Sequence, residues 1–154
     1  MIEEIFLTFM SLFFPLIVLA TWSNADAKRG EVHNIALVIP VIMSLYVFTP
    51  RFIAVFVPVF VVLVSLWLIL RRKGILGFAD VIGIPFTLMF LTKMSIFGAV
   101  AFVGVFAYLI FFAVGKQFDR KLGRFVRNRI ILLPILFLSF LVAFLVHLVV
   151  LVLF

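Results

Sequence analysis

The stretch FIAVFVPVFVVLVSLWLIL, from Phe52 to Leu70, runs for nineteen residues without a charged side chain. Basic residues bound it on both sides, Arg51 before it and the sequence RRK (71–73) after it. A helix that crosses the hydrocarbon core of a bilayer needs roughly 20 predominantly apolar residues, so this segment predicts a membrane-spanning helix. The alternation of apolar and polar residues that marks a transmembrane β-strand is missing.

The rest of the chain is equally apolar, because 68% of its 154 residues are hydrophobic and the mean hydropathy is +1.46. A water-soluble domain of this length could not bury that share in one core. The sequence therefore predicts an all-α, polytopic membrane protein, with one integral-membrane domain over residues 1–154. Charged and turn residues divide it into six expected transmembrane helices, at 5–22, 35–48, 52–70, 75–92, 95–115 and 130–153. Thr49-Pro50-Arg51 is expected to form a hairpin turn. A single helix over 35–70 would be about 54 Å long, far longer than a hydrocarbon core of about 30 Å.

The basic residues predict the orientation of these helices. Eleven of the 13 fall in the first, third and fifth connecting segments, whereas the second and fourth contain only Arg51 and Lys93. Because basic loops stay in the cytoplasm, we expect the first, third and fifth connecting segments inside and both termini outside. Glu3 and Glu4 replace the positive start of a secretory signal, so the first helix is expected to be retained. Topology and attraction to the lipid bilayer explain the net charge of +7, so no nucleic-acid partner is expected.

A small-residue track is expected along the fifth helix, where it would let another helix approach closely. Small residues recur there at every third position. The residues of this track are Gly98, Ala101, Gly104 and Ala107.

Two aspartates are candidates for chemistry. Asp80 falls within the fourth expected helix, seven residues after Lys73, and should lie one or two turns below the cytoplasmic surface. A carboxylate at the centre of a membrane helix costs roughly 2.5–3.5 kcal/mol, and less near the surface, so it marks function by default. Asp26 is expected in the first loop on the same face, four residues after Trp22, an aromatic suited to the interface. Such a pair can act on a peptide bond as general base and general acid, whereas a hydrogen bond to a neighbouring helix is the structural alternative for Asp80.

The segments around both aspartates resemble a known family. DAKRGEVHN (Asp26–Asn34) looks like the segment after the first helix of type IV prepilin and archaeal preflagellin peptidases, where an Asp precedes basic residues and an Ile/Val-Pro-Asn-like ending. GFAD (Gly77–Asp80) resembles the GxGD motif that carries their second catalytic Asp on the fourth helix. The motif order, the six helices and the cytoplasmic siding resemble the archaeal members. The specific motifs cover thirteen residues.

The resemblance implies a membrane-embedded aspartic endopeptidase that removes basic leader peptides from preflagellin- or prepilin-like precursors at the cytoplasmic membrane face. It makes Asp26 and Asp80 the catalytic pair, with Gly77 as the first glycine of the motif. It also implies a multi-pass protein of a prokaryotic, archaeal-like cell membrane. Its partner would be a precursor with a basic leader and a hydrophobic helix.

The chain departs from the family pattern at two positions. Ala79 stands where the motif has its second Gly, and His33 stands where Pro is usual. Ala still permits a close approach of backbone or substrate. The Cys-rich zinc segment of the bacterial relatives has no counterpart, because the chain has no Cys. We therefore expect neither their N-methylating activity nor an S-adenosylmethionine site.

Neighbouring polar residues are assigned supporting roles. Lys28 and Arg29 are expected to favour the ionised form of Asp26, and burial to favour the protonated form of Asp80, which would make Asp26 the base. Glu31 is a candidate acidic partner for a basic leader, and Asn34 a second substrate-binding candidate. A solvated loop charge is the alternative for Glu31.

The two histidines are not expected to be ligands. His33 is a lone loop residue that could order the loop or bind substrate, and His147 is expected to make an interhelical hydrogen bond. No nearby His or Cys stands in a ligand spacing, so neither a metal nor another cofactor is expected.

Other functions remain open at this level. A small proton-coupled transporter or channel could use Asp80 as an intramembrane proton relay. Such a protein would more naturally show polar residues along several helices at the midplane and inverted repeats, which this sequence lacks. A catalytically silent membrane scaffold is the third reading. A presenilin-like protease is disfavoured, because the chain is short and has no Pro-Ala-Leu motif.

Overall fold

The computed structural model describes residues 2–29, 32–70, 77–121 and 132–154, and these ranges contain helices but no strand. The predicted all-α class is therefore confirmed. The helices are α1 (Ile2–Arg29), α2 (Asn34–Val47), α3 (Thr49–Arg51), the π-helical turn η1 (Phe52–Phe56), α4 (Val57–Leu70), α5 (Phe78–Leu91), α6 (Ile96–Lys121) and α7 (Leu132–Leu153).

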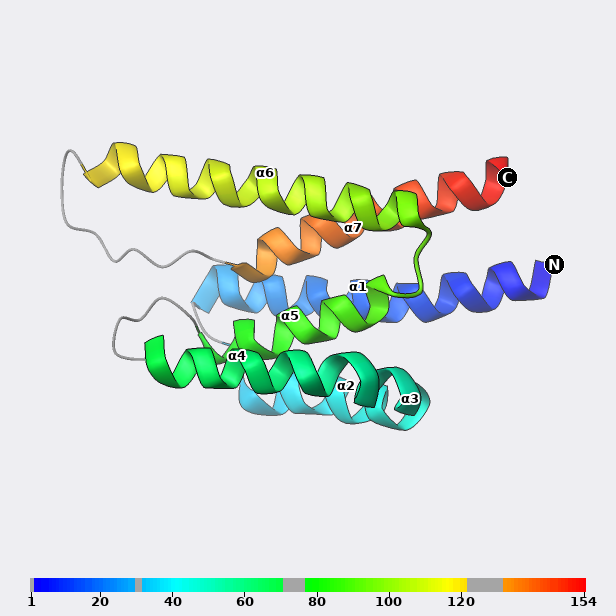
Figure 1. Cartoon of the computed structure of the whole chain (residues 1–154), viewed down its shortest axis with the longest axis horizontal. Helices are drawn as coiled ribbons and strands as arrows, with labels where there is room; N and C mark the ends of the chain where they lie inside the picture. Colours follow the sequence, from blue (N-terminus) through cyan, green and yellow to red (C-terminus); the bar gives the residue numbers. More distant parts are fainter. Residues whose placement is uncertain (1, 30–31, 71–76, 122–131) are drawn as a thin grey trace.

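The helices form a bundle in which successive rods alternate in direction (Figure 1). α3, η1 and α4 follow one another as one continuous rod. α5 packs against α1, α4 and α7, and α7 also packs against α1 and α6. Both chain termini lie at one end of the bundle, together with the α2–α3 and α5–α6 connections (Figure 1).

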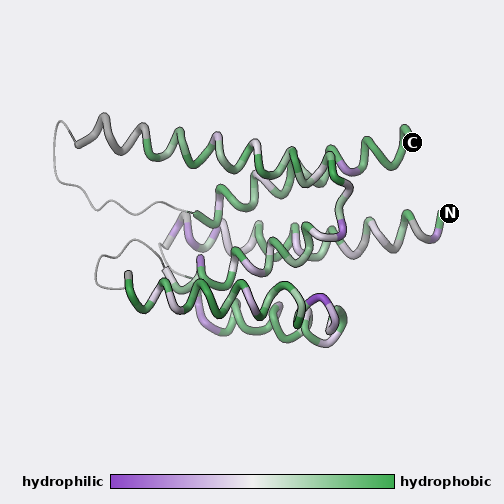
Figure 2. The backbone as a smooth tube through the Cα atoms, viewed as in Figure 1, coloured by the Kyte–Doolittle hydropathy of each residue, from purple (hydrophilic) through white to green (hydrophobic). Residues whose placement is uncertain are grey.

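The helices differ in their capacity to cross a membrane. Three described segments are long and apolar enough to do so, namely Thr49–Ile69, Ile96–Val114 and Leu132–Leu153. α2 and α5 have 14 residues each, about 21 Å of helix, which falls short of a hydrocarbon core of about 30 Å. Six transmembrane helices were expected, the second of them short, and three of the described segments are long and apolar enough to be membrane spans. Hydrophobic residues cover most of each rod, while hydrophilic ones gather towards the rod ends (Figure 2).

Two predicted boundaries are corrected. α1 continues to Arg29, so Asp26 and Lys28 are helical and do not lie in a loop. The chain breaks at Phe48, whose φ of −124° and ψ of 38° end α2, and the expected hairpin residues Thr49–Arg51 are already helical. Pro50 suits the first turn of this new helix, because a helix start leaves its N–H groups unbonded in any case.

Aromatic side chains fill the core between α1 and α5. Trp22 and Phe86 are fully buried, with ring centroids 5.1 Å apart. Phe14 lies on α1 eight residues before Trp22, and its ring centroid is 6.4 Å from that of Phe86 and 6.2 Å from that of Phe90. These contacts fix the register of α1 against α5, so that neither helix can slide without breaking them.

The small-residue track on α6 is only partly an interface. A Cβ at Gly98 would lie 3.1 Å from the backbone oxygen of Ala143 in α7, whereas nothing lies within 4 Å of one at Gly104. Ala107 is exposed. Because each step of three residues turns about 60° around the helix, the track rotates away from α7 after Gly98. The prediction of a packing track is therefore wrong for Gly104 and Ala107.

This asymmetry gives a matched pair of variants. Gly98→Leu must push α6 away from α7, and we expect it to lower the free energy of unfolding by about 1–3 kcal/mol. Gly104→Leu inserts the same side chain into open space, so its effect should stay within about 0.5 kcal/mol. Unfolding of both purified variants in detergent measures the difference, and equal losses would contradict the observed packing.

Candidate functional site

Both predicted catalytic residues are buried in the described structure. Asp26 lies in the last turn of α1 and is 6% exposed, and Asp80 is the third residue of α5 and is 4% exposed. The two helices contact each other directly. Two carboxylates from segments more than fifty residues apart therefore belong to one pair of packed helices.

The contact between Trp22 and Phe86 gives a common reference for the positions of the two carboxylates along their helices. Asp26 follows Trp22 by four residues, about 6 Å along α1, and Asp80 precedes Phe86 by six residues, about 9 Å along α5. Because α1 and α5 run in opposite directions, both displacements point to the same end of the bundle (Figure 1). Both carboxylates are therefore displaced from this contact towards the same end of the bundle. Asp80 stands about 120° around α5 from Phe86. It therefore does not lie on the face of α5 that Phe86 turns towards Trp22.

Asp80 also shapes the start of its own helix. Its Oδ2 accepts a hydrogen bond from the Gly77 amide at 3.0 Å, while the Gly77 carbonyl accepts from the amides of Asp80 and Val81. A carboxylate in the first turn also faces the positive end of the helix dipole. This hydrogen bond lies at the start of its own helix, and the structural alternative for Asp80, a hydrogen bond to a neighbouring helix, stays a prediction. Gly77 has an ordinary extended conformation, and Ala79 is buried beside it.

Trp22 links the Asp26 end of α1 to α2. Its indole N–H donates to the Ala36 carbonyl at 2.8 Å, and its ring is 1% exposed. The sequence suggested an interfacial aromatic at this position, and the structure shows a core residue instead. Trp22 lies one turn before Asp26 and contacts both α2 and α5. These contacts position the last turn of α1, which contains Asp26.

The remaining predicted site residues are placed as follows. Lys28 is exposed on α1, and the exposed residues His33 and Asn34 lie at the start of α2. The backbone of Arg29 ends α1, but its side chain and all of Glu31 lie outside the described residues. Among the residues described, no group of three or more His, Cys, Asp or Glu could hold a metal ion.

His147 was expected to make an interhelical hydrogen bond, and its observed partner lies in the connection between two helices. Its Nδ1 accepts from the Ser95 amide, in the connection before α6, at 3.0 Å. Because Nδ1 acts as the acceptor, the neutral ring carries its proton on Nε2. Nε2 is buried and has no hydrogen-bond partner in the described part of the chain. His147 therefore joins α7 to the α5–α6 connection.

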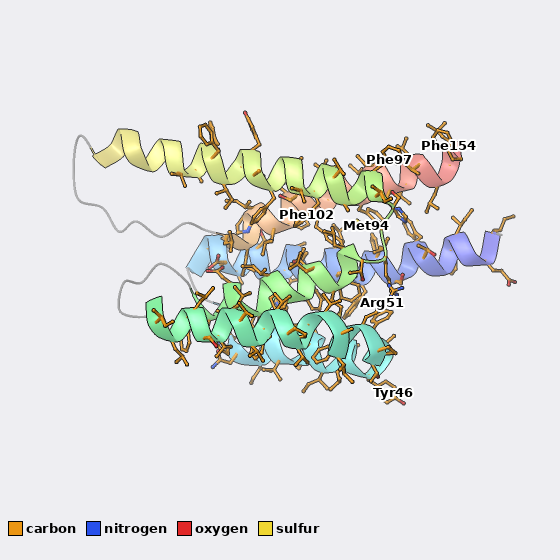
Figure 3. All side chains as sticks on the ribbon, in the orientation of Figure 1. Tyr46, Arg51, Met94, Phe97, Phe102 and Phe154 are labelled. Atoms are coloured by element: carbon orange, nitrogen blue, oxygen red, sulfur yellow. The ribbon has the colours of Figure 1, made fainter. Side chains whose placement is uncertain are left out.

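A pocket lies at the end of the bundle opposite to the aspartates. Its volume is about 690 Å³, and we call it the Arg51–Lys93 pocket. Arg51 comes from α3 and Lys93 from the α5–α6 connection, which Met94 marks in Figure 3. The other lining residues are Thr8, Ser11, Phe14, Met43, Val47, Phe48 and Thr92. The sequence placed both cations on one membrane face but gave no signal that they share a pocket.

Lys93 has a perturbed environment in this pocket. Burial, and secondly the positive charge of Arg51, lower the pKa of Lys93 from 10.5 to about 8. The Phe48 ring opposes these effects, because its face attracts the ammonium group, whose Nζ lies 3.7 Å from the ring centroid. The two cations of this pocket therefore influence each other electrostatically.

No protein-family model, curated protein or solved structure matches this chain. The described residues define a class in physical terms: an all-helical bundle with membrane-length apolar helices and two buried carboxylates at one end. The resemblance to prepilin and preflagellin peptidases therefore depends only on the residues of the two motifs, Asp26–Asn34 and Gly77–Asp80.

The cap made by Asp80 predicts different effects for two substitutions. Asp80→Ala leaves the Gly77 amide without its acceptor, and we expect the free energy of unfolding to fall by about 1–2 kcal/mol. Asp80→Asn keeps an acceptor oxygen at the same place, so its loss should be smaller by about 1 kcal/mol. Unfolding of both variants in the same detergent tests this, and equal losses would argue against the cap.

The pKa of Lys93 can be measured by its reactivity. Only the neutral amine reacts with an amine-specific reagent, so the labelling rate of Lys93 should be half-maximal near pH 8. In Arg51→Gln the midpoint should rise, because a like charge is removed, but stay below 10.5, because burial persists. Peptide mass spectrometry across a pH series measures both midpoints. A wild-type midpoint above pH 10 would contradict the described environment.

Proposed function

We propose that this protein is a membrane-embedded aspartic endopeptidase that removes basic leader peptides from preflagellin- or prepilin-like precursors. The observation that carries the proposal is the presence of two buried carboxylates, Asp26 and Asp80, at the same end of two packed helices. The likeness of DAKRGEVHN and GFAD to the family's motifs supports this reaction class. The cap of α5 accounts for a structural role of Asp80 alone, and a second buried acidic residue at the same end favours a functional site.

The distribution of basic residues supports the orientation. The aspartates share their end of the bundle with the last turns of α1, α4 and α6 and the first turns of α5 and α7 (Figure 1). In the sequence, eleven of the 13 basic residues fall at or between these helix ends. The positive-inside rule then assigns this end to the cytoplasm and both termini to the outside. The proposed site faces the cytoplasm of a prokaryotic, archaeal-like cell. The proposed partner is a precursor with a basic leader and a hydrophobic helix.

The environments of the two aspartates suggest their roles in hydrolysis. A carboxylate that accepts an amide hydrogen bond at a helix start is well suited to carry the negative charge, which favours Asp80 as the base. Asp26 lies at the carbonyl end of α1, where a second negative charge is unfavourable, and Lys28 is exposed to screening solvent. We therefore reverse the assignment expected from the sequence and propose Asp26 as the acid.

The proposed step is proton-balanced. Asp80 takes a proton from water as the water oxygen attacks the scissile carbonyl carbon, and Asp26 gives its proton to the carbonyl oxygen. In the collapse of the tetrahedral diol, Asp80 gives its proton to the leaving nitrogen as the C–N bond breaks, and Asp26 takes a proton from a diol hydroxyl, which restores both residues. Because a close pair titrates as a unit, the pH–rate profile reports the pair together. Asn34, at the start of α2, and Glu31 are proposed to contact the leader.

Cleavage by purified variants tests this proposal. A precursor with a basic leader and a hydrophobic helix is incubated with wild type, Asp26→Asn or Asp80→Asn in detergent, and products are identified by mass spectrometry. We expect each substitution to lower kcat at least about 100-fold, because each removes a proton donor or acceptor. Glu3→Gln changes an exposed carboxylate at the opposite end, so it serves as the matched control.

Two results would contradict the proposal. Cleavage that persists in both Asp variants would remove the pair from the mechanism. Proton flux in liposomes that requires Asp80 but not Asp26 would instead favour the transporter. Thermal unfolding of each variant separates loss of activity from loss of fold.

A further inference from the structure

Two like charges face the Arg51–Lys93 pocket, and its described lining contains no acidic residue. Because Arg51 and Lys93 line the same pocket, their positive charges repel each other. An anion between them would convert this repulsion into two attractions. We propose that the pocket binds the phosphate group of an anionic phospholipid. This inference concerns the end of the bundle opposite to the aspartates and does not depend on the proposed peptidase activity.

The polar groups of the pocket favour an acceptor-rich ligand. The hydroxyl of Ser11 donates to the Thr8 carbonyl at 2.8 Å, and that of Thr92 donates to the Met89 carbonyl at 2.7 Å. The donors left for a ligand are therefore the Arg51 guanidinium, the Lys93 ammonium and the Thr8 hydroxyl. Arg binds phosphate oxygens in a bidentate manner, and Lys adds a point charge.

The size and walls of the pocket favour a ligand with an apolar part. A volume of about 690 Å³ falls in the range of about 300–1,000 Å³ that holds whole small-molecule ligands. Apolar side chains form much of the wall, and two of them, Met43 and Val47, are 51% and 63% exposed on α2. The pocket therefore adjoins the apolar outer surface of α2, along which an acyl chain can lie. A bare phosphate ion would leave these walls unused.

The depth of the pocket favours a lipid source. Thr8 lies six residues after Ile2, so α1 extends about 9 Å beyond it. His147 is bonded to Ser95, two residues after Lys93, and the apolar residues 148–154 extend about 10 Å further. The cations are thus recessed below the ends of α1 and α7, where the bilayer supplies a headgroup from the side.

Lipid titration followed by native mass spectrometry tests the proposal. Purified, delipidated protein is titrated with phosphatidylglycerol, phosphatidylcholine or inorganic phosphate in a neutral detergent. We expect phosphatidylglycerol to bind at least tenfold more tightly than the other two. Arg51→Gln and Lys93→Gln should each weaken its binding about tenfold or more, and Arg51→Lys, which keeps the charge, should lose less.

Lys28→Gln is the matched control, because it removes one exposed cation at the opposite end of the bundle. Its binding of phosphatidylglycerol should equal that of wild type. Equal weakening in Lys28→Gln and Lys93→Gln would show unspecific attraction and overturn the proposal. Inorganic phosphate that binds as tightly as phosphatidylglycerol and displaces it would overturn the lipid source. Thermal unfolding confirms that each variant is folded before its titration is interpreted.

Discussion

The burial of α5 is the constraint on which the rest of the bundle depends. Ten of its 14 residues are buried, and it contacts α1, α4 and α7. Such close packing requires a small residue at Gly83, where a Cβ would lie 2.6 Å from Leu133 Cδ2 in α7. A helix held on so many sides cannot shift to accommodate its neighbours. The position of Asp80 at its start is consequently set by the whole core and not by a local loop.

The sequence predicted the helical class and most of the helix breaks, because hydropathy and charge are local signals. It could not predict where a helix end would lie when polar residues are themselves good helix formers. Asp26 was expected in a loop because charged residues follow it, yet Ala25, Ala27 and Lys28 have high helix propensity and α1 continues through them. That propensity was the signal available for the correct boundary.

Other features depended on contacts between distant segments. Burial of Asp80 followed from its position in an apolar run, but its bond to the Gly77 amide required the actual helix start. Topology placed Arg51 and Lys93 on one face, but their lateral positions depend on how α3 and the α5–α6 connection pack around Phe48. The role of Trp22 was missed for the same reason, since an aromatic near a helix end suits both an interface and a core. The predicted site therefore differs from the observed one in those features that depend on contacts between residues far apart in the sequence.

The short length of α2 has a consequence for the surrounding lipid. α2 exposes apolar side chains such as Ile39 and Ile42 over about 21 Å of helix, beside rods long enough for a full bilayer. Lipids against this face must compress or tilt, because hydrophobic mismatch is relieved by thinning the bilayer. A bilayer around the bundle is therefore expected to thin on the side of α2. The free-energy cost of this deformation depends on the acyl-chain length of the lipids, and it is lowest in membranes of short-chain lipids.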